Sequence, residues 1–190
     1  MRGLLTILSG PSGVGKDTVL NAWMERDARV RRVVACTTRR PRPGEIDGVD
    51  YHFTDHDTFL QMASQGKFLE YKQVHENWYA TPIEGMEALL SAGCVAVLKI
   101  DVQGALDAMA LRPDALTIFL MPPSIEVLDA RIRGRGTDST PEIERRLKNA
   151  HDELAQAPQY QHRVVNDQVE RTVDELELIV ESALASGCGS

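Results

Sequence analysis

The chain has 190 residues, enough for one domain with a sizeable core. Its 28 acidic and 21 basic residues give a formal net charge of −7, which argues against nonspecific binding to nucleic acid or anionic membranes. No apolar run reaches the roughly 18 residues of a membrane span, and no protein partner is implied. Three widely spaced cysteines predict neither disulfides nor a zinc site. Together with an N-terminus that lacks a signal-peptide cleavage site, they favour a cytoplasmic protein.

The first half of the chain predicts a strand and a helix, followed by several short strands. The first strand is a buried apolar run that leads directly into a glycine-rich loop. In chain order we expect a strand at 4–8, a helix from 16, strands at 33–38 and 49–53, a helix between 55 and 66, and strands at 68–74 and around 78–79.

The second half alternates helices and strands more regularly. We expect helices at 82–91, 104–110, 124–133, from 140 and at 173–183, with strands at 94–100, 116–121 and 163–166. Alternation at both ends of the chain indicates a three-layer α/β fold with a central parallel sheet. The short strands between residues 34 and 82 indicate an inserted small mixed α/β region.

A phosphate-binding loop is predicted where the first strand meets the first helix. The segment reads Gly-Pro-Ser-Gly-Val-Gly-Lys-Asp-Thr, in the strand–loop–helix context that the P-loop motif requires. Backbone N–H groups would surround phosphate oxygens, and Lys16 would reach the β- and γ-phosphates. A plain glycine turn explains fewer of these matches. The candidate ATP-binding residues are Gly10, Pro11, Ser12, Gly13, Val14, Gly15, Lys16, Asp17 and Thr18.

Asp17 departs from the motif, which has serine or threonine after the lysine to contact Mg²⁺. A carboxylate here can ligate Mg²⁺ directly, although it would also repel the phosphates. Alternatively, Asp17 is an acidic residue that the helix dipole favours in a first turn. The sequence leaves both readings open.

Beyond the loop, the chain resembles the guanylate kinase family. The resemblance rests on motifs that follow the family's order along essentially the whole chain: 37–45, 47–51, 68–70, 78–82, 100–104, 122–124, 134–137 and 165–167. It implies a P-loop fold with a core (1–33, 83–123 and 148–190), a GMP-binding insert (34–82) and a short helical lid (124–147). It also implies transfer of the γ-phosphoryl group of ATP to GMP, and to dGMP, with Mg²⁺, in purine nucleotide metabolism.

The acceptor residues that the resemblance implies make chemical sense. Arg39 and Arg42 can both bind one phosphate, and phenols at Tyr51 and Tyr79 can donate to it. Glu70 can accept from guanine N1–H and N2–H₂, a donor pair that adenine lacks.

Further site residues follow from the resemblance alone. Thr81 takes the position of a family serine that touches the base, and Asp101 that of an acid near the base and the metal. Asp17 and Asp101 are thus the candidate Mg²⁺ ligands. The candidate catalytic residues are Lys16 and three lid or lid-flanking arginines, Arg131, Arg135 and Arg146; Arg135 would also bind ATP, and Asn166 would lie near the adenine.

Three residues depart from the family pattern. Ala35 replaces a frequent serine, and Cys36 a histidine or serine. Lys99 stands two residues before Asp101, where many members carry an acid. Because the end of this strand should approach the P-loop, we expect Lys99 and Asp17 to form a charge-swapped pair beside the metal.

Two other functions compete with this interpretation. Ribose 1,5-bisphosphate kinases resemble guanylate kinases and can carry Gly-Lys-Asp in the P-loop. Guanylate-kinase-like modules of scaffolding proteins bind phosphopeptides without catalysis. The intact arginine, tyrosine and glutamate set favours GMP over ribose bisphosphate, and Lys16 favours an enzyme over a binding module.

Overall fold

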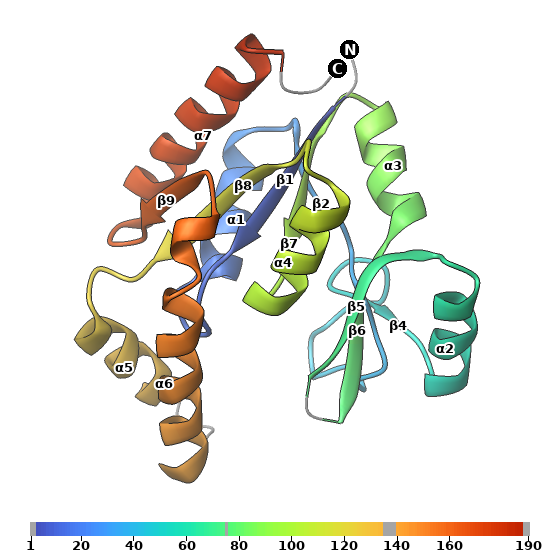
Figure 1. Ribbon diagram of the computed structural model, residues 1–190, viewed down its shortest axis with the longest axis horizontal. Coiled ribbons are helices and arrows are strands. Elements are labelled where there is room, and N and C mark those ends of the chain that lie inside the picture. The colour runs from blue at the N-terminus through green and yellow to red at the C-terminus, as the bar shows by residue number, and fades with distance from the viewer. Residues whose placement is uncertain (1–2, 75, 135–139, 188–190) are drawn as a thin grey trace.

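The computed structural model describes residues 3–74, 76–134 and 140–187. Its larger sheet is parallel throughout and supports the glycine-rich loop (Figure 1). Within the described residues the strand order is β2 (Val30–Arg32), β7 (Val95–Lys99), β1 (Leu4–Ser9), β8 (Leu116–Met121) and β9 (His162–Val165). All six residues of β1 are buried, as expected of a central strand in a parallel sheet.

Helices cover both faces of this sheet, which confirms the predicted three-layer α/β fold. On one face, α1 (Lys16–Arg26) and α7 (Val169–Ala185) bury apolar residues such as Trp23 and Leu176. On the other face, α3 (Ile83–Ser91) and α4 (Val102–Leu111) bury Met86 and Ala105. No helix in the described part of the chain has the length and apolarity that a membrane crossing requires.

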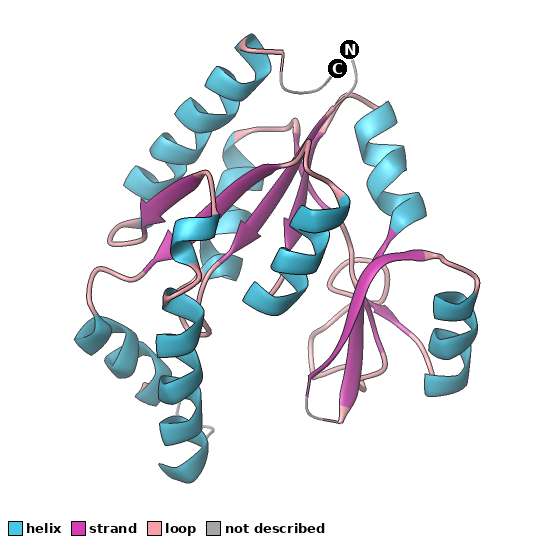
Figure 2. Cartoon of the chain, viewed as in Figure 1, coloured by secondary structure: helices cyan, strands magenta, loops and turns pink. Residues whose placement is uncertain are grey.

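A second, mixed sheet lies within the predicted insert (Figure 2). Its order is β4 (His52–Phe53), β3 (Cys36–Thr37), β6 (Asn77–Pro82) and β5 (Phe68–Val74), with β3 and β4 parallel and the other pairs antiparallel. Helix α2 (His56–Ser64) buries Phe59 against it and is capped by Asp55, whose side chain accepts from Thr58 N. This cap confirms the predicted helix start.

Two helices follow β8 and pack on each other. Helix α5 (Ile125–Arg133) contributes Leu128 and Ile132, and α6 (Thr140–Leu154) contributes Ala150. A 3₁₀ turn, η1 (Ala157–Gln159), then leads into β9. The family motif at 134–137 lies outside the described residues except for Gly134.

The predicted strand at 33–38 shortens to β3 (Cys36–Thr37), because the first part of this apolar run joins the two sheets. Val33 N makes the last hydrogen bond to the larger sheet, donating to Val97 O at 3.0 Å, and β3 starts only at Cys36. The predicted strand at 49–53 shortens to His52–Phe53, since Val49 N and Asp50 N both donate to Ile46 O in a turn.

Candidate functional site

The glycine-rich loop needs glycine at its two ends. Gly10 and Gly15 have φ of 146° and 102°, values that other residues rarely adopt. A Cβ on Gly10 would lie 2.5 Å from Leu120 O, and one on Gly15 would lie 2.7 Å from Asn166 Nδ2. The loop therefore crosses closely over β8 and the end of β9, and it delivers Lys16 to the start of α1.

Lys16 folds back over this loop. Its Nζ donates to Gly10 O at 2.5 Å and to Pro11 O at 3.1 Å. Burial lowers the pKa of Lys16 to about 8, with Glu153 opposing the shift and Lys99 adding to it. Ser12 N donates to Glu153 Oε2 at 3.1 Å, so a loop N–H already holds a carboxylate. Sequence reasoning missed Glu153, because nothing local links α6 to the loop.

Arg131 and Asn166 both donate hydrogen bonds to the backbone of the glycine-rich loop. Arg131 donates to Val14 O and to Asn166 O, each at 3.1 Å. The buried Asn166 donates from Nδ2 to Val14 O at 2.8 Å and accepts from Thr172 Oγ1 at 3.1 Å. These two predicted site residues thus contact loop backbone. Arg146 lies on α6, and Arg135 lies outside the described residues.

A cavity of about 270 Å³ brings together the predicted acceptor-phosphate residues. The rings of Tyr51 and Tyr79 meet edge-on at 6.0 Å between centroids, and the Arg39 guanidinium lies 5.4 Å from the Tyr51 centroid. The cavity thus combines the two predicted arginines and both phenols. Its lining residues are Asp17, Arg32, Arg39, Arg42, Glu45, Asp50, Tyr51, Tyr79 and Lys99.

Glu45 organises this cavity, although sequence reasoning assigned it no role. Arg39 donates from one nitrogen to both Glu45 oxygens, at 2.7 and 3.0 Å, and Arg42 N donates to Oε2 at 2.7 Å. The Arg39 hydrogen bond is the main cause that lowers the pKa of Glu45. The feature of the sequence that could have identified Glu45 is its position in the 37–45 motif, which also contains Arg39 and Arg42.

The predicted base-recognition residues also converge. Thr81 Oγ1 donates to the buried Glu70 Oε1 at 2.6 Å, and burial raises the pKa of Glu70. Asp101 caps α4 by accepting from Gly104 N at 2.8 Å. A Cβ on Gly104 would lie 2.9 Å from Glu70 Oε2 and 3.6 Å from Asp101 Oδ1, so glycine lets the two carboxylates approach the start of α4 together.

The expected pair between Asp17 and Lys99 is present. Lys99 Nζ donates to Asp17 Oδ1, and an Arg32 nitrogen lies 3.8 Å from the same oxygen. Partial burial alone would raise the pKa of Asp17, but Lys99 and Arg32 bring it below its ordinary value. Asp17 is therefore a carboxylate held between two cations.

A magnesium ion held by protein side chains does not fit these residues. Mg²⁺ requires about six oxygen ligands at close to ideal octahedral geometry, whereas the two predicted ligands are only two carboxylates, each with Oδ1 engaged, by Lys99 in Asp17 and by Gly104 N in Asp101. The described residues contain no group of three or more His, Cys, Asp or Glu side chains that could hold a metal ion.

The family follows from comparison with known proteins. A sequence model described as guanylate kinase matches residues 2–183. The chain belongs to the guanylate kinase family. It is 44% identical to the guanylate kinase of Alcanivorax borkumensis over 181 residues, covering 95% of this chain and 87% of that protein. It is 42% identical to that of Aromatoleum aromaticum over 183 residues, covering 96% and 90%.

A solved guanylate kinase has the same fold. The crystal structure of the Anaplasma phagocytophilum guanylate kinase superposes with a TM-score of 0.78 at 32% identity, covering 98% of this chain and 89% of that one. The likeness therefore includes both sheets and the helices between them, and not the P-loop region alone.

Proposed function

We propose that this chain transfers the γ-phosphoryl group of ATP to GMP, giving ADP and GDP, and that it also accepts dGMP. One observation carries the proposal. The cavity lined by Arg39, Arg42, Tyr51 and Tyr79 is also lined by Asp17, in the first turn of the P-loop helix. A phosphate bound there would lie beside the end of a triphosphate held by the loop.

The reaction needs positioning more than proton transfer. A phosphate oxygen of GMP forms a bond to the γ-phosphorus of ATP while the bond from that phosphorus to the bridging β–γ oxygen breaks, and ADP takes that oxygen away. Lys16 would leave its two carbonyl acceptors for the β- and γ-phosphates, and the loop N–H groups would exchange Glu153 for phosphate oxygen.

Mg²⁺ would come with ATP, whose phosphate oxygens and bound waters supply most of its ligands, and would neutralise phosphate charge. This agrees with the absence of a fitting side-chain site among the described residues. Asp17 and Asp101 would contribute as ligands through Oδ2, because Oδ1 of each accepts a hydrogen bond from Lys99 or Gly104 N.

Recognition of guanine would fall to Glu70. Its carboxylate would accept from N1–H and N2–H₂, with Thr81 holding one oxygen and Asp101 nearby. AMP lacks this donor pair and would leave a buried acceptor unpaired.

The chain would then act as a core with two moving parts. These are the GMP-binding insert at 34–82 and a lid at 124–147 that closes over the nucleotides with Arg135 and Arg146. The proposed setting is the cytoplasm, with ATP and GMP as small-molecule partners.

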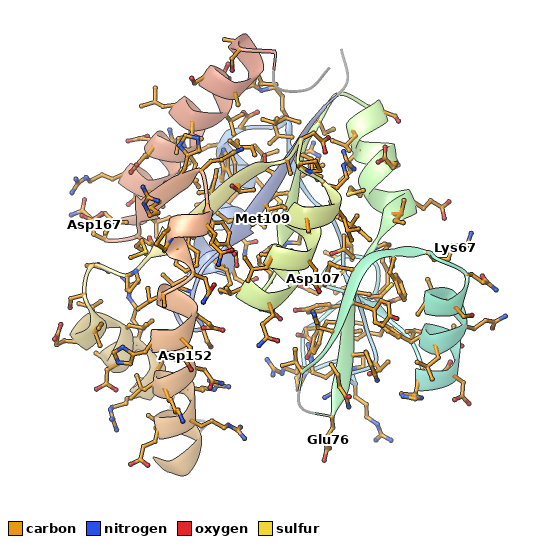
Figure 3. All side chains as sticks on the ribbon, viewed as in Figure 1. Lys67, Glu76, Asp107, Met109, Asp152 and Asp167 are labelled. Atoms are coloured by element: carbon orange, nitrogen blue, oxygen red, sulfur yellow. The ribbon has the colours of Figure 1, made fainter. Side chains whose placement is uncertain are left out.

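The test is an ADP-release assay with GMP, dGMP, AMP and ribose 1,5-bisphosphate as acceptors. We expect turnover with GMP and dGMP, little with AMP, and a loss of at least about 100-fold in Lys16→Met. Lys67 is an exposed lysine just before β5, so Lys67→Met is the matched control and should behave as wild type (Figure 3). Turnover with ribose 1,5-bisphosphate but not with GMP would overturn the proposal.

A further inference from the structure

Lys99 stands between the two phosphate sites. It is the last residue of β7 and pairs in register with Leu8 of β1, just before the glycine-rich loop. Its Nζ donates to Asp17 in the loop helix and lies 6.0 Å from the centroid of Tyr51, a ring of the acceptor cavity. The parallel sheet places this ammonium there, because strand ends meet at one edge.

The acids around the cavity are already engaged. Glu45 accepts from Arg39 and from Arg42 N, and Asp50 accepts from Ile46 N at 2.8 Å. Asp17 is held by Lys99 and Arg32. The four basic side chains of the lining outnumber its three acids, so the cavity favours an anionic ligand.

The Lys99 ammonium also has capacity left for a ligand. An ammonium carries three N–H donors. Asp17 takes one of them, and the described residues supply no second hydrogen-bond acceptor. With only 17% of its side chain exposed, Lys99 has limited access to water for its other donors.

We propose that Lys99 binds the phosphate of the acceptor nucleotide, as a third cation beside Arg39 and Arg42, and that Asp17 is the positioning residue that orients it. This rests on the proposed GMP kinase function. The Lys99 ammonium reaches the phosphate from the P-loop side, next to Asp17, while the arginines reach it from the insert. The carboxylate that replaces the motif's hydroxyl residue thus serves a lysine and not a metal ion.

The experiment compares GMP with guanosine, which lacks the phosphate. Equilibrium affinities for both are measured on the full chain without ATP or Mg²⁺. Lys99→Met should weaken GMP binding by about tenfold or more and leave guanosine affinity within about twofold, which also shows that the variant folds. Lys99→Arg should retain most of the GMP affinity, and Lys67→Met should change neither affinity.

A double-mutant cycle with Asp17→Asn separates phosphate binding from simple charge neutralisation. We expect Asp17→Asn/Lys99→Met to bind GMP as weakly as Lys99→Met, because the ligand's cation is still missing. Recovery of wild-type GMP affinity in the double variant would show that Lys99 only neutralises Asp17, and would overturn the proposal.

Three outcomes separate the failure of this inference from the failure of the proposed function. A wild-type chain that neither binds nor phosphorylates GMP refutes the function itself. If the wild-type chain does turn over GMP, equal GMP affinity in wild type and Lys99→Met refutes only the role of Lys99. A loss of affinity in Lys99→Met confined to an ATP analogue would assign Lys99 to the donor and also refute it.

Discussion

The carboxyl group of Glu70 lies in a buried environment that disfavours its charged form. The side chain is 8% exposed, and its pKa lies above the ordinary value of 4.5 because burial disfavours the carboxylate. Thr81 offsets part of this cost by donating to Oε1. A guanine base that donates to the same carboxylate would offset more of this cost. The charged Glu70 side chain should therefore cost less free energy in the complex than in the free protein.

Replacing Glu70 by Gln should therefore improve stability while impairing function. We expect kcat/KM for GMP to fall by about 100-fold, because an amide N–H₂ faces guanine donors, while ATP affinity stays unchanged. Glu76→Gln, on the exposed tip between β5 and β6, is the matched control (Figure 3). Equal losses of GMP and ATP affinity in Glu70→Gln would mean that Glu70 is structural.

The pH dependence of stability tests the same substitution. A raised carboxyl pKa means that the folded protein holds the proton more tightly, so wild type loses stability as pH rises from about 4.5 through the raised pKa. Glu70→Gln lacks this loss. It should be more stable by about 1 kcal/mol at pH 7 and no more stable at pH 4, as measured by denaturant unfolding.

At the scale of single residues, the side chains within a motif were predictable, whereas the hydrogen-bond partners within an irregular loop were not. Arg39, Tyr51 and Glu70 were predicted from the resemblance to the guanylate kinase family, and their side chains carry the groups that a phosphate and a guanine require. Glu45 was missed because its partners are a guanidinium and a backbone N–H in an irregular loop, where no periodicity marks which residues meet.

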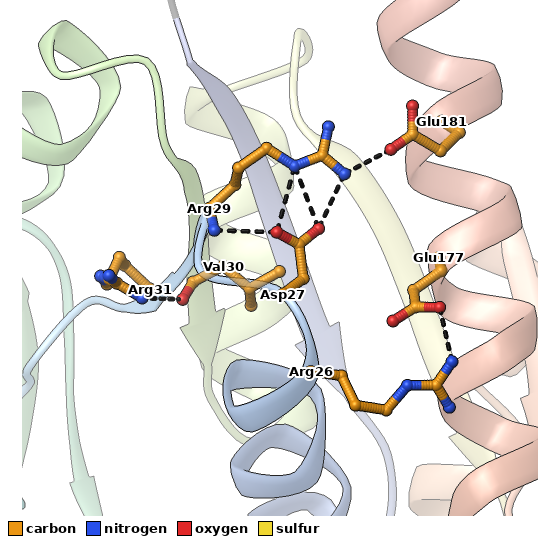
Figure 4. A network of polar contacts seen from close by, with 7 residues as sticks. All are labelled: Arg26, Asp27, Arg29, Val30, Arg31, Glu177 and Glu181. Carbon is orange, nitrogen blue, oxygen red and sulfur yellow. Dashed lines mark hydrogen bonds and ion pairs between the residues drawn. The ribbon is translucent and has the colours of Figure 1, made fainter.

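At the scale of elements, an ionic network joins the end of α1 to α7. Arg29 donates to Asp27 and to Glu181, and Arg26 donates to Glu177 (Figure 4). These side chains lie largely on the surface, where ion pairs contribute little and salt screens them. The buried apolar face of α7, with Val173, therefore makes the larger contribution to its attachment.

Arg29→Ala should lower the Tm by about 1 to 2 °C at low salt. The difference should shrink as sodium chloride is raised, because screening weakens the pairs in wild type. The matched control is Arg31→Ala, whose side chain donates only to the backbone of its neighbour Val30 among the described residues (Figure 4). A salt-independent loss in Arg29→Ala would point to packing instead of charge.

Whether a segment forms a helix or a strand was predictable where all of its residues have the same environment, such as the buried interior of a sheet. Val95–Lys99 and Leu116–Met121 are nearly continuous apolar runs, and both are central strands. The run from Val33 is also apolar, but it leaves one sheet and enters another. Local sequence does not show where Val33 makes its last bond to β7, since that depends on a strand about 60 residues away.

At the scale of the whole molecule, the proposed ATP site is assembled from distant parts of the chain. Val14 O is held by Arg131 from α5 and by Asn166, which follows β9, 152 residues further along. The P-loop motif predicted the loop itself. Its support could not be predicted, because it depends on β8 and β9 pairing in parallel at residues such as Met121 and Val165.

Asn166→Ala should destabilise the protein and impair ATP binding in particular. The substitution removes the Nδ2 hydrogen bond to Val14 O and the bond from Thr172, while Arg131 still donates to Val14 O and Thr172 still donates to Gln168 O, so we expect a cost of about 0.5 to 1.5 kcal/mol in unfolding free energy. We expect weaker binding of an ATP analogue and little change in GMP affinity. Asp167→Asn, at the exposed neighbouring position (Figure 3), should change neither. An equal decline in both affinities would mean that Asn166 supports the fold and not the loop specifically.

The bond between Val14 and Asn166 also has a consequence for synthesis of the chain. The side chain that holds Val14 O is made 152 residues after Val14 itself. Domains acquire their native contacts only when all of their strands are available. We therefore expect a growing chain to lack a fully supported glycine-rich loop until Asn166 has been made and β9 has paired with β8, so shorter copies would bind nucleotide weakly.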